Sequence, residues 1–427
     1  MKFKKLFCVL FIMLFCFIIL FSTYSNGATF NVNSPSAILF NVNTGKILYE
    51  KNAYEKRYPA STTKMMTAIL TLENCDLNDT ATVSSTAVIL PPGYISAHLQ
   101  VGEVITINDL LHLLLIISSN DAANVLAEHI AGSVSNFSTM MNDKAKEIGC
   151  LNTHFVNPNG AQNVNHYSTA YDLCLIANYA MKNETFRKLV SIDSYTVPAT
   201  NKYEERKLTN TNALLQQVNE KTNTKNIYYY KYAIGIKTGY TNQAKNCLVA
   251  GASKDGVEFI SVVLESDLNE SDNNSERFAD SKKLLETAID NYSMFPVKKT
   301  NDLITTVTIQ NTLPWKKDLN LLLENDITLL LENKDMNTEI KPEIHLLEEK
   351  LNAPINKGDI LGTATFTYNG TSVTSNLIAA NDVPTNEQFN TTLKIIGIIF
   401  GIIVLRIIVV RNKKKKRARM RRRTRRR

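Results

Sequence analysis

A continuous apolar segment near the C-terminus limits how this chain of 427 residues can fold more than any other feature. The segment Ile395–Val410 is interrupted only by Arg406 and is followed by 13 basic residues among the last 17. A run without a polar face is typical of a helix that spans a bilayer, and an arginine near its end can reach the headgroups. We therefore predict a transmembrane helix at 394–410. Because the segment is short, a helix lying in the membrane interface is the alternative.

The basic tail indicates how such a helix is oriented. Lysine and arginine stay on the cytoplasmic side of a membrane helix. We therefore predict a cytoplasmic tail at 411–427 and a single-pass protein of the cell membrane, with everything before the helix on the extracytoplasmic side.

The N-terminus has the layout of a secretory signal. Three lysines precede an apolar run at Leu6–Phe21, and small and polar residues follow through Ala28. We predict a signal peptide at 1–28 that is cleaved near Ser25–Ala28. An uncleaved signal anchor is the alternative, although the apolar run is short for a membrane span.

The positive net charge lies at the two ends of the chain. The formal charge is +8, but three lysines fall within the predicted signal and 15 basic residues lie from Lys394 onward, where there are no acidic residues. The region between them holds the other 30 basic side chains and all 40 acidic ones. This acidic balance argues against a nucleic-acid partner and favours anionic lipid as the partner of the basic tail.

The cysteines and histidines give no sign of a metal or cofactor site. No C-x-x-C or H-E-x-x-H pattern occurs among the six cysteines and six histidines, so we predict neither a metal nor a cofactor. Four cysteines follow the predicted signal and are interpreted as small core residues. They are Cys75, Cys150, Cys174 and Cys247.

The region 33–295 mixes helix and strand patterns. Apolar residues recur at helical spacing in INDLLHLLLIISS, DAANVLAEHIAG and AYDLCLIANYAM, whereas AILFNVNTGKILYEKN reads as two strands around a turn. YAIGIKTGY, NCLVAGAS and VEFISVVLES are further strand candidates, and Lys254-Asp255-Gly256 suits a hairpin between the last two. We predict an α+β domain with an antiparallel sheet.

The pattern changes after this region. LITTVTIQ, DITLLLEN, EIKPEIHLL and ILGTATFTYNG alternate as strands do, and no good helix is present. We predict a small all-β domain, a β-sandwich, at 298–380, followed by a polar linker at 381–393.

One short stretch of the first domain has the arrangement of a nucleophile and its base. In YPASTTKMMTAIL, Pro59 favours a helix start, so Ser61 falls in the first turn and Lys64 lies on the same face three residues later. The unpaired N–H groups of that turn favour a developing oxyanion. Taken alone, Ser61 is equally an N-cap and Lys64 a solvated lysine.

Two further motifs follow in the same domain. IISSNDAANV puts Ser118 and Asn120 at a helix junction, where Asn120 or Asp121 is a suitable N-cap. GIKTGYT puts Lys237-Thr238-Gly239 at the end of a predicted strand. Each motif alone is compatible with a purely structural role.

Together, and in this order, the motifs match the S-x-x-K, S-x-N and K-T-G set of penicillin-binding proteins and class A β-lactamases. The chain resembles the low-molecular-weight penicillin-binding proteins that act as D-alanyl-D-alanine carboxypeptidases. Stretches such as NVNTGKILYEKN and AKEIGCLNTHFVNPNGAQNVNHYSTAYD also look like family sequence, and the resemblance covers about 33–380. It implies a penicillin-binding, β-lactamase-like catalytic domain followed by a β-rich module. Many relatives have an amphipathic C-terminal helix, whereas this chain has a predicted span.

The resemblance implies a role for each motif residue. Ser61 is the nucleophile and Lys64 its base, which must be neutral, and a second cation at Lys237 favours that state. Ser118 relays a proton to the leaving amine, and Asn120 binds the substrate peptide. The remaining motif residues bind substrate: Thr238 with Lys237 at the terminal carboxylate, and Gly239 and Tyr240 along the strand, where the N–H of Tyr240 and that of Ser61 form the oxyanion hole.

An arginine outside the motifs is a further candidate. The resemblance places Arg277 near the substrate carboxylate, for which a guanidinium offers a bidentate fork, although it is also compatible with a surface helix position. For Asn157, Asn159, His166 and Asp172 we expect only loop or capping hydrogen bonds.

The predicted function is a serine-type D-Ala-D-Ala carboxypeptidase that trims peptidoglycan pentapeptide and is covalently inhibited by β-lactams. A D,D-endopeptidase that cuts cross-links uses the same chemistry and stays open as the alternative. A β-lactamase is less favoured, because Glu147 has the wrong spacing for the family's deacylating glutamate. A non-catalytic wall-binding module is disfavoured by the intact Ser61, Lys64 and Lys237.

Overall fold

A computed structural model describes residues 28–219, 223–269 and 274–424 of the chain. The predicted signal peptide lies outside these residues apart from Ala28. The chain divides into two compact units. The first extends to Ser293 and includes Glu332–Lys334, and the second comprises Met294–Leu331 and the chain from Asp335 onward.

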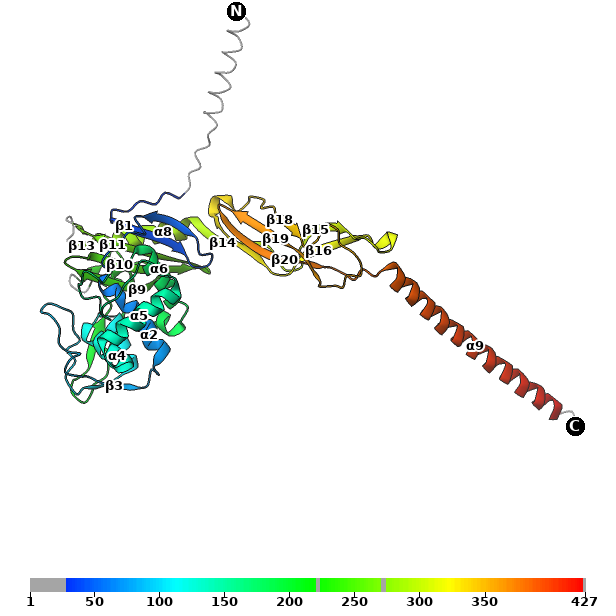
Figure 1. Ribbon diagram of the computed structural model, residues 1–427, viewed down its shortest axis with the longest axis horizontal. Helices are drawn as coiled ribbons and strands as arrows, with labels where there is room; N and C mark the ends of the chain where they lie inside the picture. The colour runs from blue at the N-terminus through cyan, green and yellow to red at the C-terminus, as the bar shows by residue number, and fades with distance from the viewer. Residues whose placement is uncertain (1–27, 220–222, 270–273, 425–427) are drawn as a thin grey trace, which may run out of the picture. The chain divides into compact units, whose positions relative to one another are not determined.

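The first unit is built on an antiparallel sheet of strand order β2-β1-β11-β10-β9 (Figure 1). The predicted hairpins are confirmed, because β1 pairs with β2 and β10 pairs with β11. The turn between β10 and β11 has Asp255 and Gly256 at φ 50° and 82°, as a two-residue hairpin of matching twist requires. The strands are β1 (Ser36–Asn41), β2 (Ile47–Lys51), β9 (Ala233–Thr241), β10 (Lys245–Lys254) and β11 (Val257–Ser266).

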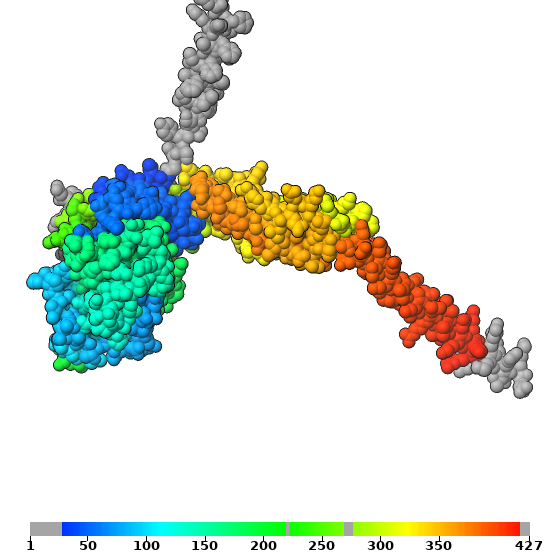
Figure 2. All heavy atoms as spheres, viewed as in Figure 1, coloured from blue at the N-terminus to red at the C-terminus, as the bar shows by residue number. Residues whose placement is uncertain are grey.

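Helices cover this sheet. Consecutive residues of β10 and β11 are buried, so both faces of these strands are covered. Ile260 and Val262 join the main apolar cluster with residues of α2 to α7, and α8 lies against β10 and β11. The helices are α2 (Lys64–Asn74), α3 (Ile107–Leu115), α4 (Asn120–Ala131), α5 (Val134–Ile148), α6 (Ala170–Ala180), α7 (Glu184–Ser191) and α8 (Glu276–Asn291). The space-filling view shows these segments as one continuous body (Figure 2).

Short strand pairs and turns complete the first unit. The paired strands are β3 (Thr80–Thr82) with β4 (Val104–Thr106), β5 (Ser194–Val197) with β6 (Arg206–Thr209), β7 (Val218–Asn219) with β8 (Thr224–Lys225), and β12 (Leu268–Asn269) with β13 (Asn274–Ser275). The 3₁₀ turns are η1 (Ala60–Thr63) and η2 (Ala213–Leu215).

The helix start predicted after Pro59 is confirmed, with a 3₁₀ first turn. Pro59 is the N-cap of η1, which leads directly into α2. Two glycines let other segments approach this turn. A Cβ on Gly160 would lie 1.9 Å from the carbonyl oxygen of Ala60, and one on Gly239 would lie 3.2 Å from the nitrogen of Ser61. The turn is therefore held between a loop and strand β9.

The described part of the second unit consists of β-strands, the 3₁₀ turn η3 (Pro314–Lys316) and a last helix. A five-stranded antiparallel sheet has the order β15-β16-β20-β19-β18, and β14 pairs with β17. The four predicted strands are present as β15 (Leu303–Thr308), β17 (Ile327–Glu332), β18 (Glu343–Leu346) and β19 (Ile360–Tyr368). The sequence interpretation missed three strands: β14 (Tyr292–Lys298), β16 (Asp318–Leu323) and β20 (Thr371–Ala379). The consecutive leucines in β16 fit a helical period as well as the alternation of a strand. The β20 sequence has few apolar residues and so gives a weak strand signal.

The apolar C-terminal segment lies in one long helix, α9 (Asn386–Thr424). This helix begins before the predicted start at 394, because Thr385 and Gln388 form a capping box. The N–H of Gln388 donates to Thr385 Oγ1 at 3.1 Å, and the N–H of Thr385 donates to Gln388 Oε1 at 3.1 Å. The segment Asn386–Ala418 is long and apolar enough to cross a membrane by length and composition.

The contact at Gly160 predicts a stability difference between two alanine variants. Gly160 and Gly149 both have positive φ, but a Cβ on Gly149 would meet nothing within 4 Å. Gly149→Ala should cost only the left-handed penalty of about 1–2 kcal/mol. Gly160→Ala should cost about 1–3 kcal/mol more, because it also overpacks the turn.

Urea unfolding of the full-length protein, followed by tyrosine near-UV circular dichroism, measures this difference. The single tryptophan, Trp315, lies in the second unit, so its fluorescence transition should be unchanged. Equal losses for the two variants would show that the turn is not held by this contact.

Candidate active site

The three motifs meet at one cleft of about 570 Å³ in the first unit. Its lining includes Ser61 from η1, Ser118 and Asn120 from the α3–α4 junction, and part of β9. Lys64 and Lys237 lie buried beside it. The residues that line it are Ser61, Pro92, Gly93, Tyr94, Ile95, Ser118, Asn120, Gly160, Gln162, Thr211, Thr238, Gly239, Tyr240, Thr241, Asn242, Gln243 and Arg277.

The Lys64 amine is at the centre of the site. Its Nζ lies 2.9 Å from Ser61 Oγ, 2.8 Å from Asn120 Oδ1 and 2.6 Å from the carbonyl oxygen of Asn159. Neither of the last two oxygens carries a hydrogen, so each must accept an N–H. A neutral amine has two N–H groups and one lone pair, and the lone pair then faces the Ser61 hydroxyl. This geometry is that of a general base.

The surroundings of Lys64 favour that neutral form. Complete burial lowers its pKa well below the usual value, the charge of Lys237 lowers it further, and only Asp121 acts in the opposite direction. Burial alone would raise the pKa of Asp121, but hydrogen bonds from Ser119, Ser96 and two backbone N–H groups hold it below its ordinary value. Asp121 therefore stays an anion beneath the site.

The junction before α4 presents Ser118 and Asn120 to the cleft. Ser118 has φ 66°, an uncommon conformation for serine, and its buried Oγ has no hydrogen-bond partner among the described residues. Asn120 Nδ2 donates to the carbonyl of Ile95 at 2.8 Å, which fixes the amide so that Oδ1 faces Lys64. The N-cap of α4 is Ser119, not Asn120 or Asp121, so Asn120 remains available to the cleft.

Strand β9 forms the opposite wall. Lys237 is buried, and its Nζ donates to the carbonyl of Thr238 at 3.0 Å. Burial lowers the pKa of Lys237 to about 7, with a further contribution from the charge of Arg277. Thr238 Oγ1 lies 2.6 Å from Thr211 Oγ1. Tyr240 also lines the cleft and is 58 % exposed.

Arg277 lines the same cleft from α8 and is not a surface helix residue. Its Nη1 donates to the carbonyl of Gly239 at 2.8 Å, and burial lowers its pKa to about 10. Gly239 O and the N–H of Tyr240 belong to the same peptide group. The arginine therefore polarises the peptide that the resemblance assigns to the oxyanion hole.

Sequence reasoning misses two contributors to the site. For Asn159 it predicts only loop hydrogen bonds, yet the Asn159 carbonyl holds Lys64; a backbone atom leaves no signal in residue type. For Asp121 it predicts only a possible cap. The SND sequence was the available signal, since a carboxylate beside a buried lysine bears on its pKa.

The expected loop and capping roles of three other residues are confirmed. Asn157 Oδ1 accepts the N–H of Gly160 at 2.7 Å, and His166 Nε2 lies 2.8 Å from Thr63 Oγ1. Asp172 Oδ2 accepts the N–H of Asn152 at 2.8 Å. Burial lowers the pKa of His166 to about 3, so this side chain is neutral and structural.

The cysteines and Glu147 lie apart from the lining. Cys150, Cys174 and Cys247 are buried as predicted, whereas Cys75 is half-buried, and all four are free. Glu147 is 60 % exposed on α5 and pairs with Lys144 at 2.8 Å. Within the described part of the chain, no group of three or more His, Cys, Asp or Glu is arranged to hold a metal.

Comparisons with known proteins agree with this geometry. A family model described as D-alanyl-D-alanine carboxypeptidase matches residues 23–268, and one described as penicillin-binding protein 5, C-terminal domain, matches 292–385. The D-alanyl-D-alanine carboxypeptidase DacF of Bacillus subtilis is 34% identical over 367 residues, which cover 84% of this chain and 88% of the relative.

Solved structures give the same result. The D-alanyl-D-alanine carboxypeptidase DacD of Francisella tularensis has a TM-score of 0.64 at 26% identity, covering 85% of this chain and 100% of that one. Penicillin binding protein 5 of Haemophilus influenzae has a TM-score of 0.63 at 28% identity, covering 83% and 98%. The chain therefore belongs to the D-alanyl-D-alanine carboxypeptidase family and is a serine-type D-Ala-D-Ala carboxypeptidase.

Proposed function

We propose that the enzyme removes the terminal D-alanine of peptidoglycan pentapeptide through an acyl-enzyme on Ser61. The observation that carries this mechanism is the 2.9 Å distance between Lys64 Nζ and Ser61 Oγ. When the two N–H groups of the neutral amine are donated to Asn120 Oδ1 and the Asn159 carbonyl, its lone pair is directed at this hydroxyl. Lys64 takes the hydroxyl proton as Oγ bonds to the carbonyl carbon of the penultimate D-alanine. The oxyanion is stabilised by the N–H groups of Ser61 and Tyr240.

Collapse of this intermediate breaks the carbon–nitrogen bond. The proton on Lys64 passes through the Ser118 hydroxyl to the leaving amine, so free D-alanine departs and Lys64 is neutral again. A water molecule then gives its proton to Lys64, attacks the ester, and Ser61 regains its hydrogen as the shortened stem leaves. The unpartnered Ser118 Oγ supports the relay, because it has a donor and acceptor free for both partners.

A carboxylate site at one end of the cleft favours carboxypeptidase over endopeptidase action. Lys237 and Thr238 of β9 and Arg277 of α8 bring two basic side chains and a hydroxyl together at this cleft. A terminal D-alanine carboxylate matches this charge, whereas a cross-linked stem continues beyond that position. The fused ring of a penicillin also carries a carboxylate, so β-lactams fit the site as covalent inhibitors.

Two terminal segments place the catalytic unit outside the membrane in this proposal. The N-terminal signal directs export and is cleaved. Helix α9 then anchors the protein in a single pass with its basic end in the cytoplasm, where anionic lipid holds it. The absence of a polar face along Ile395–Val410 supports a span over an interfacial helix.

Product analysis tests the function. The purified protein should release free D-alanine from pentapeptide muropeptides and leave cross-linked dimers uncut, and Ser61→Ala should abolish release. Liquid chromatography with mass spectrometry resolves both products. Cleavage of the dimers at a comparable rate would show that the endopeptidase alternative is correct.

The lowered pKa of Lys237 predicts the alkaline limb of the pH profile. The ammonium is charged below about 7 and neutral above it, so kcat/KM on a D-Ala-D-Ala peptide should fall about tenfold per pH unit above that value. Lys237→Arg should remove this limb, because a guanidinium stays charged.

A matched control for this pH profile is Lys207→Arg, because Lys207 is 81% exposed on β6. Its profile should equal that of the wild type. If the alkaline limb of the kcat/KM profile is unchanged in Lys237→Arg, a group other than Lys237 causes it.

Replacing Arg277 should reduce the rate of peptide hydrolysis more than the rate of acylation by penicillin. Loss of a charge-assisted contact costs about 2–4 kcal/mol, or roughly 30- to 1000-fold in kcat/KM on the peptide. Acylation by penicillin should fall less, since ring strain supplies part of its reactivity, but it should still fall because Arg277 contacts Gly239 O.

Both rates are measured for Arg277→Ala beside Arg187→Ala. Arg187 is half-buried and pairs with Glu258 at 2.9 Å, and it is absent from the lining of the cleft. Equal and small losses of rate on both substrates would show that Arg277 does not bind the substrate carboxylate.

A further inference from the structure

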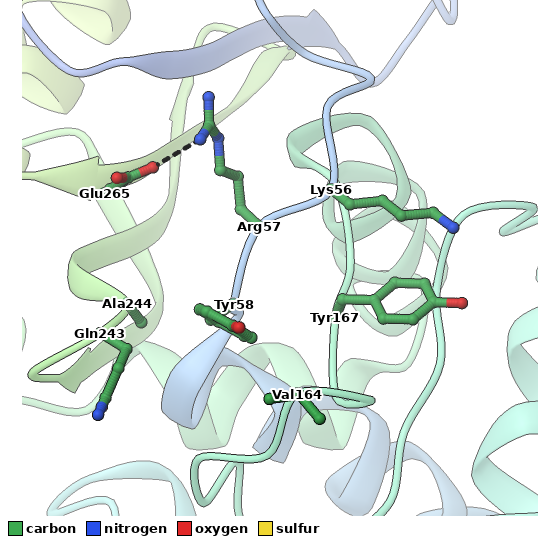
Figure 3. A pocket seen from close by; sticks show the side chains of 8 residues that line it. All are labelled: Lys56, Arg57, Tyr58, Val164, Tyr167, Gln243, Ala244 and Glu265. Atoms are coloured by element: carbon green, nitrogen blue, oxygen red, sulfur yellow. Dashed lines mark ion pairs between the residues drawn. The ribbon is translucent and has the colours of Figure 1, made fainter.

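A second cavity of about 340 Å³ lies in the first unit next to the active-site cleft (Figure 3). Its centre is apolar and its sides are charged. Tyr58 and Val164 lie in the middle, with Lys56 along the Tyr167 ring on one side and the Arg57–Glu265 pair on the other. The lining residues are Lys56, Arg57, Tyr58, Val164, Tyr167, Gln243, Ala244 and Glu265.

The cavity continues the direction in which the substrate lies. Gln243 lines both the cleft and the cavity. If the terminal carboxylate lies at Thr238 and the scissile carbonyl at Tyr240, the rest of the stem runs on toward Thr241 and Gln243. Tyr58 precedes Ser61 by three residues and so lies at most ~10 Å from it. That distance is roughly two or three residues of an extended stem.

One side of the cavity is fixed in place. Arg57 Nη1 pairs with Glu265 at 2.8 Å, and its other nitrogen pairs with Glu55. Glu265 has φ 61° at an irregularity of the β10–β11 pairing, where the register shifts between Asn246 and Leu248. Bulges of this kind redirect side chains and are frequent beside active sites. The two carboxylates pair with the two Nη atoms of Arg57, whereas its buried Nε has no hydrogen-bond partner among the described residues.

Lys56 on the other side is not neutralised. Its Nζ lies 4.3 Å from the centre of the Tyr167 ring and makes no ion pair with a carboxylate among the described residues. Arg57 is paired with the carboxylates of Glu55 and Glu265, so Lys56 carries the one basic charge of the cavity lining that no carboxylate of the described residues neutralises. An ammonium in this position attracts an anion.

We propose that this cavity is a subsite for the acyl-donor stem, and that it binds a carboxylate-bearing residue upstream of D-Ala-D-Ala. The carboxylate lies at Lys56, and the aliphatic part of the same residue lies on Tyr58, Val164 and Ala244. This proposal rests on the carboxypeptidase function above and adds a specificity determinant to it. Lys56 is a binding residue here and takes no part in the chemical steps.

The test uses pentapeptides that end in D-Ala-D-Ala and differ at one internal residue, which carries a free carboxylate or its carboxamide. Two such pairs place this residue one or two positions before D-Ala-D-Ala. The wild-type protein should prefer the carboxylate member of one pair by ~2- to 5-fold in kcat/KM, as a charge pair at the exposed Lys56 allows. The preference should decrease as salt is added.

Substitutions in the cavity show whether the preference comes from Lys56 itself or from the net charge of the protein. Lys56→Gln should abolish the preference and Lys56→Glu should reverse it, with little change on the carboxamide peptide. Val164→Glu, at a side chain that is 76% exposed, should also reduce the preference. Lys146→Gln is the matched control, because Lys146 is 77% exposed on α5, and it should keep the wild-type preference.

The outcomes are distinct. If the wild type hydrolyses both members of each pair equally, the subsite is absent while the carboxypeptidase function stands. If it hydrolyses none of the peptides, the proposed function itself fails. Equal losses on both members in Lys56→Gln, or loss of preference in Lys146→Gln, would also overturn the subsite.

Discussion

The burial of the Lys64 amine is the constraint on which the rest of the catalytic unit depends. A lysine taken out of water is stable only as the neutral amine or with full hydrogen bonding. Here both conditions are met, because Asn120 Oδ1 and the Asn159 carbonyl accept its two N–H groups. Helix α2, the α3–α4 junction and the loop at 157–160 must therefore meet within hydrogen-bond distance.

Three basic side chains around the cleft differ in how firmly they hold their protons. Arg277 keeps its charge, with a pKa of about 10, Lys237 has a pKa of about 7, and the pKa of Lys64 is lowered well below its usual value. Each positive charge lowers the pKa of the next side chain, since Arg277 lowers the pKa of Lys237 and Lys237 lowers the pKa of Lys64. The result is a neutral amine next to Ser61, while Arg277 keeps its positive charge beside Lys237.

The sequence was sufficient for the fold class and the identity of the motif residues, because these depend on side-chain type and local spacing. Ser61 and Lys64 share one turn, and Lys237-Thr238-Gly239 share one strand end. The sequence was insufficient where a backbone atom, or a contact between residues far apart in the chain, contributes to the site. The Asn159 carbonyl has no residue signature, and the contact of Arg277 with Gly239 O depends on how α8 lies against the sheet.

With Lys64 as the base in both steps, the proposed mechanism needs no second base for hydrolysis of the acyl-enzyme. In the class A β-lactamases a separate glutamate acts in deacylation. Here Glu147 is exposed and paired with Lys144. In the proposed mechanism Ser118 returns the proton of Lys64 to the leaving group, so the Lys64 amine is neutral again when the acyl-enzyme has formed. The same lone pair can then activate water, so the burial that creates the nucleophile also permits its release.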